Sequence, residues 1–506
     1  MASLLALLPN KFGRARSNNT PRTTTPDDDG EVRRDRSQPR NWSERRKVFD
    51  TSMVVLLEAT TAMISNTGAT AADHAHKDLK ISRTGTIAVF ASTYLIAQAL
   101  GAVIFPPFTE SFGRKKTYIV TTVLYSLFTA LVMTGKGGKP HLAAIIIGRL
   151  FSGMMSAIPS VVVIGSIEDM WSPRARIFPI QAWVSVSVMG LVFGPAFATV
   201  IADRWQWRMI YGISAIIVAI QALLICFIKE SRPKCIPEIP DEPLPRTEPN
   251  IRPTLVRATS THPTLKQFAK TSLDLPIRLF FGEPLVFAVT IMSATVFSLL
   301  YLFTEAFIIV YTDFGFAREK IAYINTLMAI GPLFPVLVRL RDIKVGRKRK
   351  AQGRQITPED KLLGFFIAAP IFAAALWIFS WTVPPLTHIS PWVSASSLIP
   401  IGYAVSEFDH VLSSYLADSY AHIAGSASAP LAFLRASLSA VFPLIGEAMF
   451  KNMGSNYAGT VLAVMATAYC GVAVWFGLKG KELREGSKWI KRNAVVVEER
   501  RMDDPK

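Results

Sequence analysis

The stretch PPFTESFGRKK, residues 106–116, separates two long apolar segments of the chain. The segment before it begins near residue 86, and the segment after it ends near residue 134. Each has about the 20 apolar residues that a helix needs to cross a bilayer. Glu110, Gly113 and the cations that follow are residue types that can hold two helix ends together and release them when the helices move. This stretch, named here the basic turn, therefore predicts a tight connection between two membrane spans.

The rest of the chain repeats this alternation of apolar segments and polar connections. Of its 506 residues, 50% are hydrophobic and 18% are charged, and the mean hydropathy is +0.31. The charges are gathered in tails and connections, which is typical of a polytopic membrane protein. Twelve apolar runs have the length of a membrane span. We predict an all-α membrane protein with twelve transmembrane helices in two six-helix halves.

Composition divides the chain into five parts. The tail at the start of the chain and the central connection are rich in proline and charge, so they have little apolar surface to bury. Two rigid halves joined by such a connection suit a transporter that moves its halves around a central site. The predicted parts are a disordered cytosolic tail (1–46), a six-helix half (47–228), a cytosolic linker (229–283), a second six-helix half (284–478) and a cytosolic C-terminal tail (479–506).

The formal net charge is +18, and a strong excess of basic residues is also typical of proteins that bind nucleic acids. Here the basic residues lie mostly in the tails and in alternate connections, as the positive-inside rule requires. We therefore expect both termini in the cytosol and no nucleic-acid partner. Lys77, Lys80 and Arg83 run against this trend, because they lie in a connection predicted to face outward.

The sequence shows no pattern typical of a metal site or an enzyme. The run DHAHKD at 73–78 has two histidines two residues apart, which do not share a helix face, and we interpret it as a solvated loop. The three cysteines are isolated from one another. No nucleophile stands in a cluster with a base. We predict no enzyme activity, no metal and no cofactor.

The basic turn resembles the loop between spans two and three in the major facilitator superfamily, particularly its fungal drug:proton antiporter branch. The pattern there is G-P-L-S-E-x-x-G-R-R-P, and Pro106 stands in place of its first glycine. Arg149 and Gly153 match the family's R-x-x-x-G element in span four. Residues 190–195 resemble the core of the antiporter motif in span five, although Ala198-Thr199 replaces its final glycine pair.

The second half resembles the fungal multidrug, toxin and polyamine exporters. Glu283-Pro284 opens span seven, the run YLFTEAF follows at 301–307, and PEDKL at 358–362 has lysine where the family usually has arginine. The resemblance implies the major facilitator fold, a small-molecule substrate and a proton gradient as the energy source.

Charged residues inside membrane spans are the first candidates for function, because burying them in hydrocarbon is costly. Arg149 matches an arginine thought to take part in proton coupling, and the alternative is that it only pins helices or snorkels. A buried carboxylate gains proton affinity. Glu305 is the first candidate for a proton carrier and Glu58 the second, unless either is only the structural partner of a cation. The residues predicted for proton coupling or gating are Glu110, Gly113, Arg114, Arg149, Asp169, Gly194, Pro195 and Glu305.

The substrate cavity is expected to have a mainly apolar and aromatic lining, which tolerates many lipophilic ligands. Glu407 and Asp409 lie in span ten, where the family is usually apolar. They are either specific to this protein's substrate or interfacial charges at the end of the span. The residues predicted to bind substrate are Glu58, Phe297, Tyr301, Phe303, Phe307, Tyr403, Glu407, Asp409 and Arg435.

Three functions compete. The first is proton-coupled export of lipophilic drugs, toxins or secondary metabolites by alternating access. The second is uptake of a small organic nutrient by a facilitator or symporter, and polyamine export is a variant of the first. The third, a membrane sensor or enzyme, lacks a supporting motif. We expect a monomer in the plasma membrane or, alternatively, the vacuolar membrane.

Overall fold

The computed structural model describes residues 38–135, 139–172, 175–232, 274–352, 361–386, 389–420 and 424–486, without some side chains that include Glu110. The predicted N-terminal tail up to residue 37, the greater part of the linker and the C-terminal tail from residue 487 lie outside the described residues.

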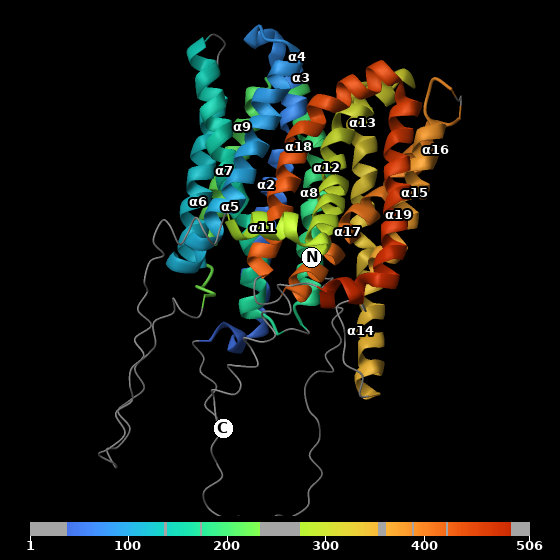
Figure 1. Cartoon of the computed structure of the whole chain (residues 1–506). Coiled ribbons are helices and arrows are strands. Elements are labelled where there is room, and N and C mark those ends of the chain that lie inside the picture. Colours follow the sequence, from blue (N-terminus) through green and yellow to red (C-terminus); the bar gives the residue numbers. More distant parts are fainter. Residues whose placement is uncertain are drawn as a thin grey trace, which may run out of the picture. The chain divides into compact units, whose positions relative to one another are not determined.

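The first set of spans forms a bundle of long helices (Figure 1). α5 packs on α7, α2 packs on α8, and α6 packs on both α7 and α9. The elements are η1 (Pro39–Asn41), α2 (Glu44–Ser65), α3 (Gly68–Leu79), α4 (Arg83–Ile87), η2 (Ala88–Ser92), α5 (Thr93–Phe112), α6 (Arg114–Met133), α7 (Lys139–Met170), α8 (Ile177–Arg204) and α9 (Arg208–Ile225).

The second set follows the linker, and its main contacts are α12 with α18 and α15 with α19. Its last helix extends beyond residue 478, where we predicted the second half to end. The elements are α11 (Leu275–Gly282), α12 (Pro284–Asp313), α13 (Arg318–Asn325), η5 (Thr326–Leu333), α14 (Pro335–Ala351), α15 (Leu363–Thr382), α16 (Pro391–Ser396), α17 (Leu398–Ser419), α18 (Ala424–Met453) and α19 (Ser455–Gly486).

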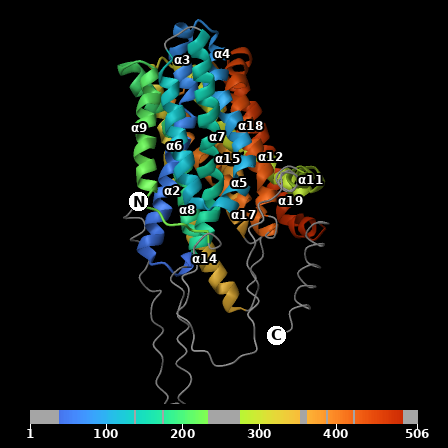
Figure 2. The ribbon, with the colours of Figure 1, turned by 90° about the vertical axis from the view of Figure 1, so that its left-hand side faces the viewer.

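The bundle has a lower and an upper end. The lower end carries the start of α2 and the turn between α5 and α6, and the upper end carries α4 and the turn between α18 and α19 (Figure 1). α11 runs across the direction of the long helices (Figure 2) and packs on α18 and α12.

Eleven helical stretches in the described part of the chain are long and apolar enough to cross a membrane, against the twelve that we predicted. The missing one is span ten, which is α17. It has 22 residues, enough to cross a bilayer. Its polar residues Glu407, Asp409 and His410 lower its hydropathy, and all three are buried. The helical membrane fold is confirmed. Span ten falls short in hydropathy because it carries polar residues that are buried in protein.

Two spans are interrupted near contacts between the two sets of helices. α2 ends at Ser65 and α3 begins at Gly68, so residues 66–67 break the first span. In span eight, η5 is a 3-10 helix that contains Pro332 and is followed by Pro335. Proline lacks a backbone N–H and disturbs the α-helical bonding pattern. Non-helical backbone at this depth occurs in membrane proteins where it is buried in protein or lines a cavity.

The run at 73–78 is not the solvated loop that we expected. It lies in α3, which extends the first span toward the upper end, and Asp73 is buried. Among the described residues, no group of three or more His, Cys, Asp or Glu side chains is placed to hold a metal ion.

We predict that Gly153→Ala destabilises the protein, whereas Gly471→Ala does not. A Cβ at Gly153 would overlap the backbone carbonyl of Tyr94 on α5, and a Cβ at Gly471 would meet open space. Overpacking of this kind costs about 1–3 kcal/mol. Both glycines lie in helices, so the small gain in helix propensity is shared. The apparent melting temperature in detergent measures the difference, and equal values for the two variants would contradict this packing.

Candidate functional site

The two sets of helices meet mainly at four pairs of elements. α5 packs on α18, and α8 packs on η5, α13 and α17. Hydrogen bonds cross this contact at the break in the first span. Ser65 Oγ lies 2.8 Å from the hydroxyl of Tyr301 on α12, and Asn66 Nδ2 donates to Thr304 Oγ1 at 3.0 Å. The interruption of span one thus supplies polar groups to the interface between the halves.

Glu58 lies within the first span and is 5% exposed. Its Oε1 accepts a hydrogen bond from Ser187 Oγ on α8 at 3.0 Å, and its Oε2 has no partner among the described residues. Asp409 and Arg435, from the second half, are close enough to act on it electrostatically. Glu58 is therefore a buried carboxylate with one free oxygen, near the charges of the other half.

Asp409 and Arg435 form a buried ion pair in the second half. Arg435 Nη1 lies 2.9 Å from Asp409 Oδ1, and the guanidinium lies 4.6 Å from the ring centre of Phe297. The three side chains come from α17, α18 and α12. Together with Glu58 and Tyr301 they form a group that we name the central site.

Glu407 does not belong to the central site, although only one residue separates it from Asp409. Residues two positions apart on an α-helix point about 200° apart. Glu407 pairs with Arg339 on α14, and a Cβ at Gly364 on α15 would overlap its carboxylate. Arg339 also lies 3.1 Å from Asp342. Both Glu407 and Asp409 are buried in protein.

The predicted aromatic residues fall into different surroundings. Phe303 stacks on Phe307, with ring centres 5.2 Å apart, and both contact Phe379 of α15. These rings pack within the second half. Tyr403 lies on α17 one turn before Glu407 and is buried. The burial of Phe303 is therefore explained by packing against other rings, as is common for aromatic residues in helical membrane proteins.

Arg149 is 1% exposed and does not snorkel. Its Nε donates to the carbonyl of Phe90 at 2.6 Å, and its guanidinium lies 4.2 Å and 5.2 Å from the ring centres of Tyr94 and Tyr211. Its Nη2 has no hydrogen-bond partner in the described structure. Phe90 lies in η2, a π-helical turn, and such turns often occur at functional sites. Arg149 thus joins α7 to an irregular turn of the second span through a hydrogen bond, and its guanidinium also contacts tyrosine rings of α5 and α9.

The basic turn lies at the lower end. Gly113 has φ +88°, a conformation that favours glycine and permits the abrupt change from α5 to α6. Arg114 Nε lies 2.7 Å from Asp169, so two of the predicted residues meet across α6 and α7. The side chain of Glu110 lies outside the described part. Glu230, which sequence reasoning missed, accepts the backbone N–H groups of Arg114 and Lys115 at 2.9 and 3.0 Å.

Glu305 lies at the upper part of the interface and is 1% exposed. Arg83 Nη2 donates to its Oε2 at 2.5 Å. The same arginine pairs with Asp73 at 2.5 Å and with Glu447. Sequence reasoning missed Arg83, Asp73 and Glu447. The signal was nevertheless there, because Arg83 was among the basic residues that violate the positive-inside trend.

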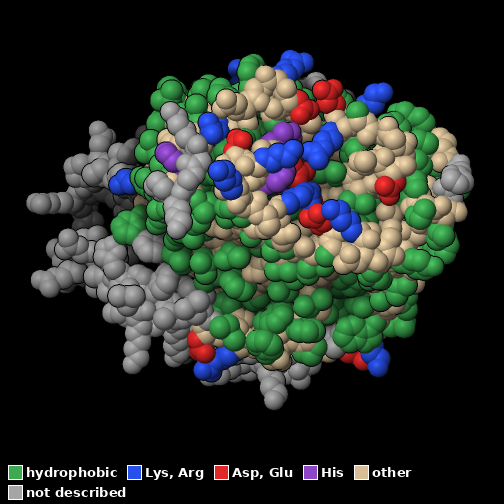
Figure 3. Space-filling view, turned by 90° about the horizontal axis from the view of Figure 1, so that it is seen from above, with side chains coloured by type: hydrophobic (Ala, Val, Ile, Leu, Met, Phe, Trp, Pro, Cys, Tyr) green, Lys and Arg blue, Asp and Glu red, His purple; other side chains and the backbone are tan. Residues whose placement is uncertain are grey.

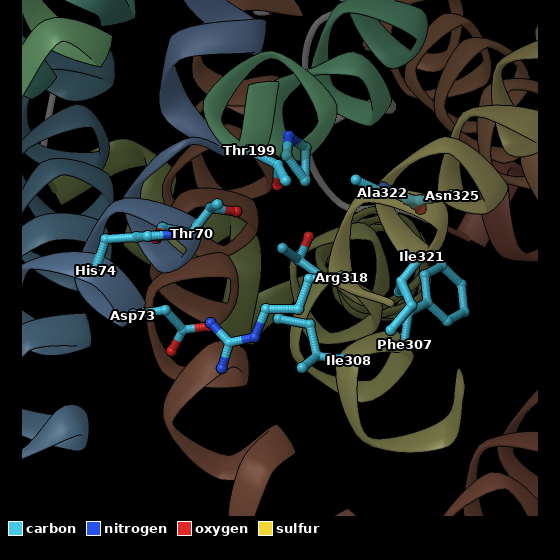
Figure 4. Close-up of a pocket in the computed structure, with 12 residues that line it drawn as sticks. Thr70, Asp73, His74, Thr199, Phe307, Ile308, Arg318, Ile321, Ala322 and Asn325 are labelled. Carbon is cyan, nitrogen blue, oxygen red and sulfur yellow. The ribbon is translucent and has the colours of Figure 1, made fainter. Parts of the chain in front are cut away.

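A small cavity lies beside Asp73 between α3, α8, α12 and α13 (Figure 4). Its volume of about 40 Å³ has room for a few waters and not for a drug-sized molecule. Figure 4 shows Thr70, Asp73 and His74 on one side and Ile321, Ala322 and Asn325 on the other, with the Arg318 side chain directed toward Asp73. Pro195 and Phe307 line it too, while Gly194 packs on the carbonyl of Met63 in α2.

Comparisons with known proteins agree with this architecture. The model of the Major Facilitator Superfamily matches residues 53–443. A multidrug transporter of Candida glabrata is 28% identical over 459 residues, 89% of this chain and 78% of that protein. An efflux pump of Gibberella fujikuroi is 25% identical over 471 residues, 90% of this chain and 93% of that protein.

A solved structure of a proton:xylose symporter shares the fold. Its TM-score is 0.60 at 14% sequence identity, and the match covers 86% of this chain and 97% of that chain. At this level of identity the likeness concerns the fold alone. Since the family model covers most of the chain and the helices form the same bundle, the protein belongs to the major facilitator superfamily of membrane transporters.

Proposed function

We propose that this protein exports lipophilic drugs, toxins or secondary metabolites from the cell in exchange for protons, by alternating access. The relatives named as a multidrug transporter and an efflux pump cover nearly the whole chain, which supports this substrate class. The lower end then faces the cytosol with both termini, and the plasma membrane is the proposed location, with the vacuolar membrane as the alternative.

The observation that carries the proposal is the burial of carboxylates at the contact between the halves. Glu58 and Glu305 are both at least 95% buried and lie on opposite sides of the interface. A charged group inside a membrane bundle is costly, so it is paired or serves transport. Each of these carboxylates has one oxygen without a hydrogen-bond partner in the described residues, Oε2 of Glu58 and Oε1 of Glu305. Such an oxygen is available to a proton.

Glu305 is the proposed proton carrier. It is paired with Arg83 of the other half, so gain or loss of its charge acts directly on a contact between the halves. Glu58 is the second candidate, because its environment includes the charged pair of Asp409 and Arg435. A proton at either position changes the electrostatics of the interface, which is the requirement for coupling protons to alternating access.

The central site is the proposed location of substrate. Its aromatic rings, the free oxygen of Glu58 and the pair of Asp409 with Arg435 combine apolar surface with a few fixed polar groups. The partners of the protein are then a small molecule, protons and the lipid bilayer. We propose that it works as a monomer without a cofactor, an enzymatic reaction or a nucleic acid, with the proton gradient as its energy source.

Uptake is the second candidate function. The antiporter motif departs from its pattern at Ala198-Thr199, and Thr199 lines the small cavity beside Asp73. The same fold serves a proton:xylose symporter, so fold cannot decide direction.

The deciding experiment measures accumulation of labelled lipophilic toxins, dyes and polyamines in cells that lack their own pumps. The cells are compared with and without this protein, and with and without a protonophore. Export predicts accumulation that the protein lowers and the protonophore restores. Accumulation raised by the protein would favour uptake, and an effect confined to polyamines would favour polyamine export.

We predict that Glu305→Gln reduces protonophore-sensitive export to near background while the protein still reaches the membrane, because a neutral amide cannot carry the proton. Glu168→Gln is the matched control, since the Glu168 side chain is 41% exposed at the lower end and pairs with Arg176 of the same half. The measurement is the initial efflux rate at equal surface expression. Full activity of the Glu305 variant would remove Glu305 from the coupling mechanism.

We also predict that Tyr301→Phe changes the export rate by about two- to tenfold, since a neutral hydrogen bond contributes about 0.5–1.5 kcal/mol. The lost bond joins the two halves through Ser65. Tyr311→Phe, which removes a bond to Ser394 within the second half, is expected to leave the rate unchanged. Equal effects of the two substitutions would show that the bond across the halves has no special role.

A further inference from the structure

Arg83 is a cation shared by three carboxylates at the upper end of the bundle. It begins α4, and its guanidinium uses all three nitrogens. Nε lies 2.5 Å from Asp73, Nη2 lies 2.5 Å from Glu305, and Nη1 pairs with Glu447. The planar guanidinium can make such a set of bonds at once, whereas an ammonium is a single point of charge.

Two of these three pairs join the halves. Asp73 lies on α3, in the same half as Arg83, while Glu305 and Glu447 lie on α12 and α18 of the other half. The carboxylates of Asp73 and Glu305 are almost fully buried, with side-chain exposures of 3% and 0%, and Arg83 itself is 25% exposed. These four residues are named here the upper clamp.

Other charged residues lie near the upper clamp. Lys451 pairs with Glu447 from the same helix, at 2.6 Å, and its side chain is 58% exposed. His74 lies 3.4 Å from Asp203 in the first half. Arg318, on α13 of the second half, lines the neighbouring cavity with its side chain directed toward Asp73, and it is exposed (Figure 4). Figure 3 shows basic, acidic and histidine side chains gathered near the middle of this upper face.

Without Arg83, three carboxylates would face one another in a partly buried space. Like charges at this depth repel strongly, because the surroundings screen them poorly. The upper ends of the two halves could then approach only at a high cost in free energy. The position of Arg83 against the positive-inside trend is explained by this requirement.

A second contact ties the span that carries Arg83 to Arg149 on α7. The π-helical turn η2 follows α4 directly, and its Phe90 carbonyl accepts the hydrogen bond from Arg149. Ser92 Oγ in this turn donates to the carbonyl of Ala440 on α18 at 2.6 Å. The upper part of span two is therefore tied to the other half at Arg83 and again at Ser92.

We propose that Arg83 is the gating residue that closes the upper end of the transporter. The upper end opens when Arg83 leaves Glu305 and Glu447 and keeps Asp73, which moves with it in the same half. This inference deepens the proposed function and rests on it for the outward orientation of the upper end. It assigns to Glu447 the role of a second acceptor, beside Glu305.

The test measures the distance across the upper end directly. Spin labels are attached at Thr84→Cys and Asn452→Cys, both exposed and on opposite halves, in the full chain with its three native cysteines replaced by serine. Double electron–electron resonance spectroscopy on the purified protein in lipid nanodiscs then gives the distribution of distances between the two labels. From it follow the populations of closed and open upper ends, without any substrate.

Arg83→Gln is expected to raise the ratio of open to closed upper ends by about tenfold or more, because removing one partner of a buried pair is strongly destabilising. The double variant Glu305→Gln with Glu447→Gln is expected to do the same. Arg83→Lys, which keeps the charge, is expected to give an intermediate ratio and provides a milder variant if Arg83→Gln folds poorly.

Arg208→Gln is the matched control. Arg208 also lies at the upper end, but its carboxylate partner, Asp78 at 4.0 Å, belongs to the same half. Its loss should leave the distances unchanged. The gate is refuted if both Arg83 variants keep the native distances, or if Arg208→Gln opens the upper end equally. If the distances shift while no compound shows proton-dependent export, the gate stands and the proposed substrate class fails.

Discussion

The structure depends on the cost of holding charged groups inside an apolar bundle. Hydrocarbon offers no hydrogen bonds, so each buried charge must find a partner within the protein. Here the partners are supplied from other helices. Arg435 meets Asp409, Arg339 meets Glu407, and Arg114 meets Asp169. Two of the three partners of Arg83 lie in the opposite half. The need to pair these charges therefore creates a contact between the two halves.

Polar contacts lie at three levels of the bundle. At the lower end, the basic turn ties α6 to α7 and to the start of the linker through Asp169 and Glu230, within one half. In the middle, Tyr301 and Asn66 bridge the halves through neutral hydrogen bonds. At the upper end the bridge is ionic. Transport by alternating access requires contacts of this kind that can be broken and remade, whereas the apolar helix packing stays intact.

Span ten illustrates how charge placement and topology combine. Glu407 and Asp409 look equivalent in the chain, yet the helix turns them to opposite sides. Asp409 joins the central site. Glu407 forms a buried pair with Arg339 on α14, and the missing side chain of Gly364 leaves space for its carboxylate. The same polar residues lower the hydropathy of α17 below that of the eleven other spans in the described part of the chain, although it lies within the bundle and is largely buried.

The sequence by itself determined the fold class, because apolar runs of spanning length and the motifs around Gly113, Arg149 and Gly194 are local properties. It also singled out Glu58, Glu305, Asp409 and Arg435, since a charge in an apolar run is visible without coordinates. Only the tertiary structure decided which charges meet. Arg83 and Glu305 are 222 residues apart, and no local pattern encodes their contact. Such pairing follows from how the helices pack, and packing depends on all of them together.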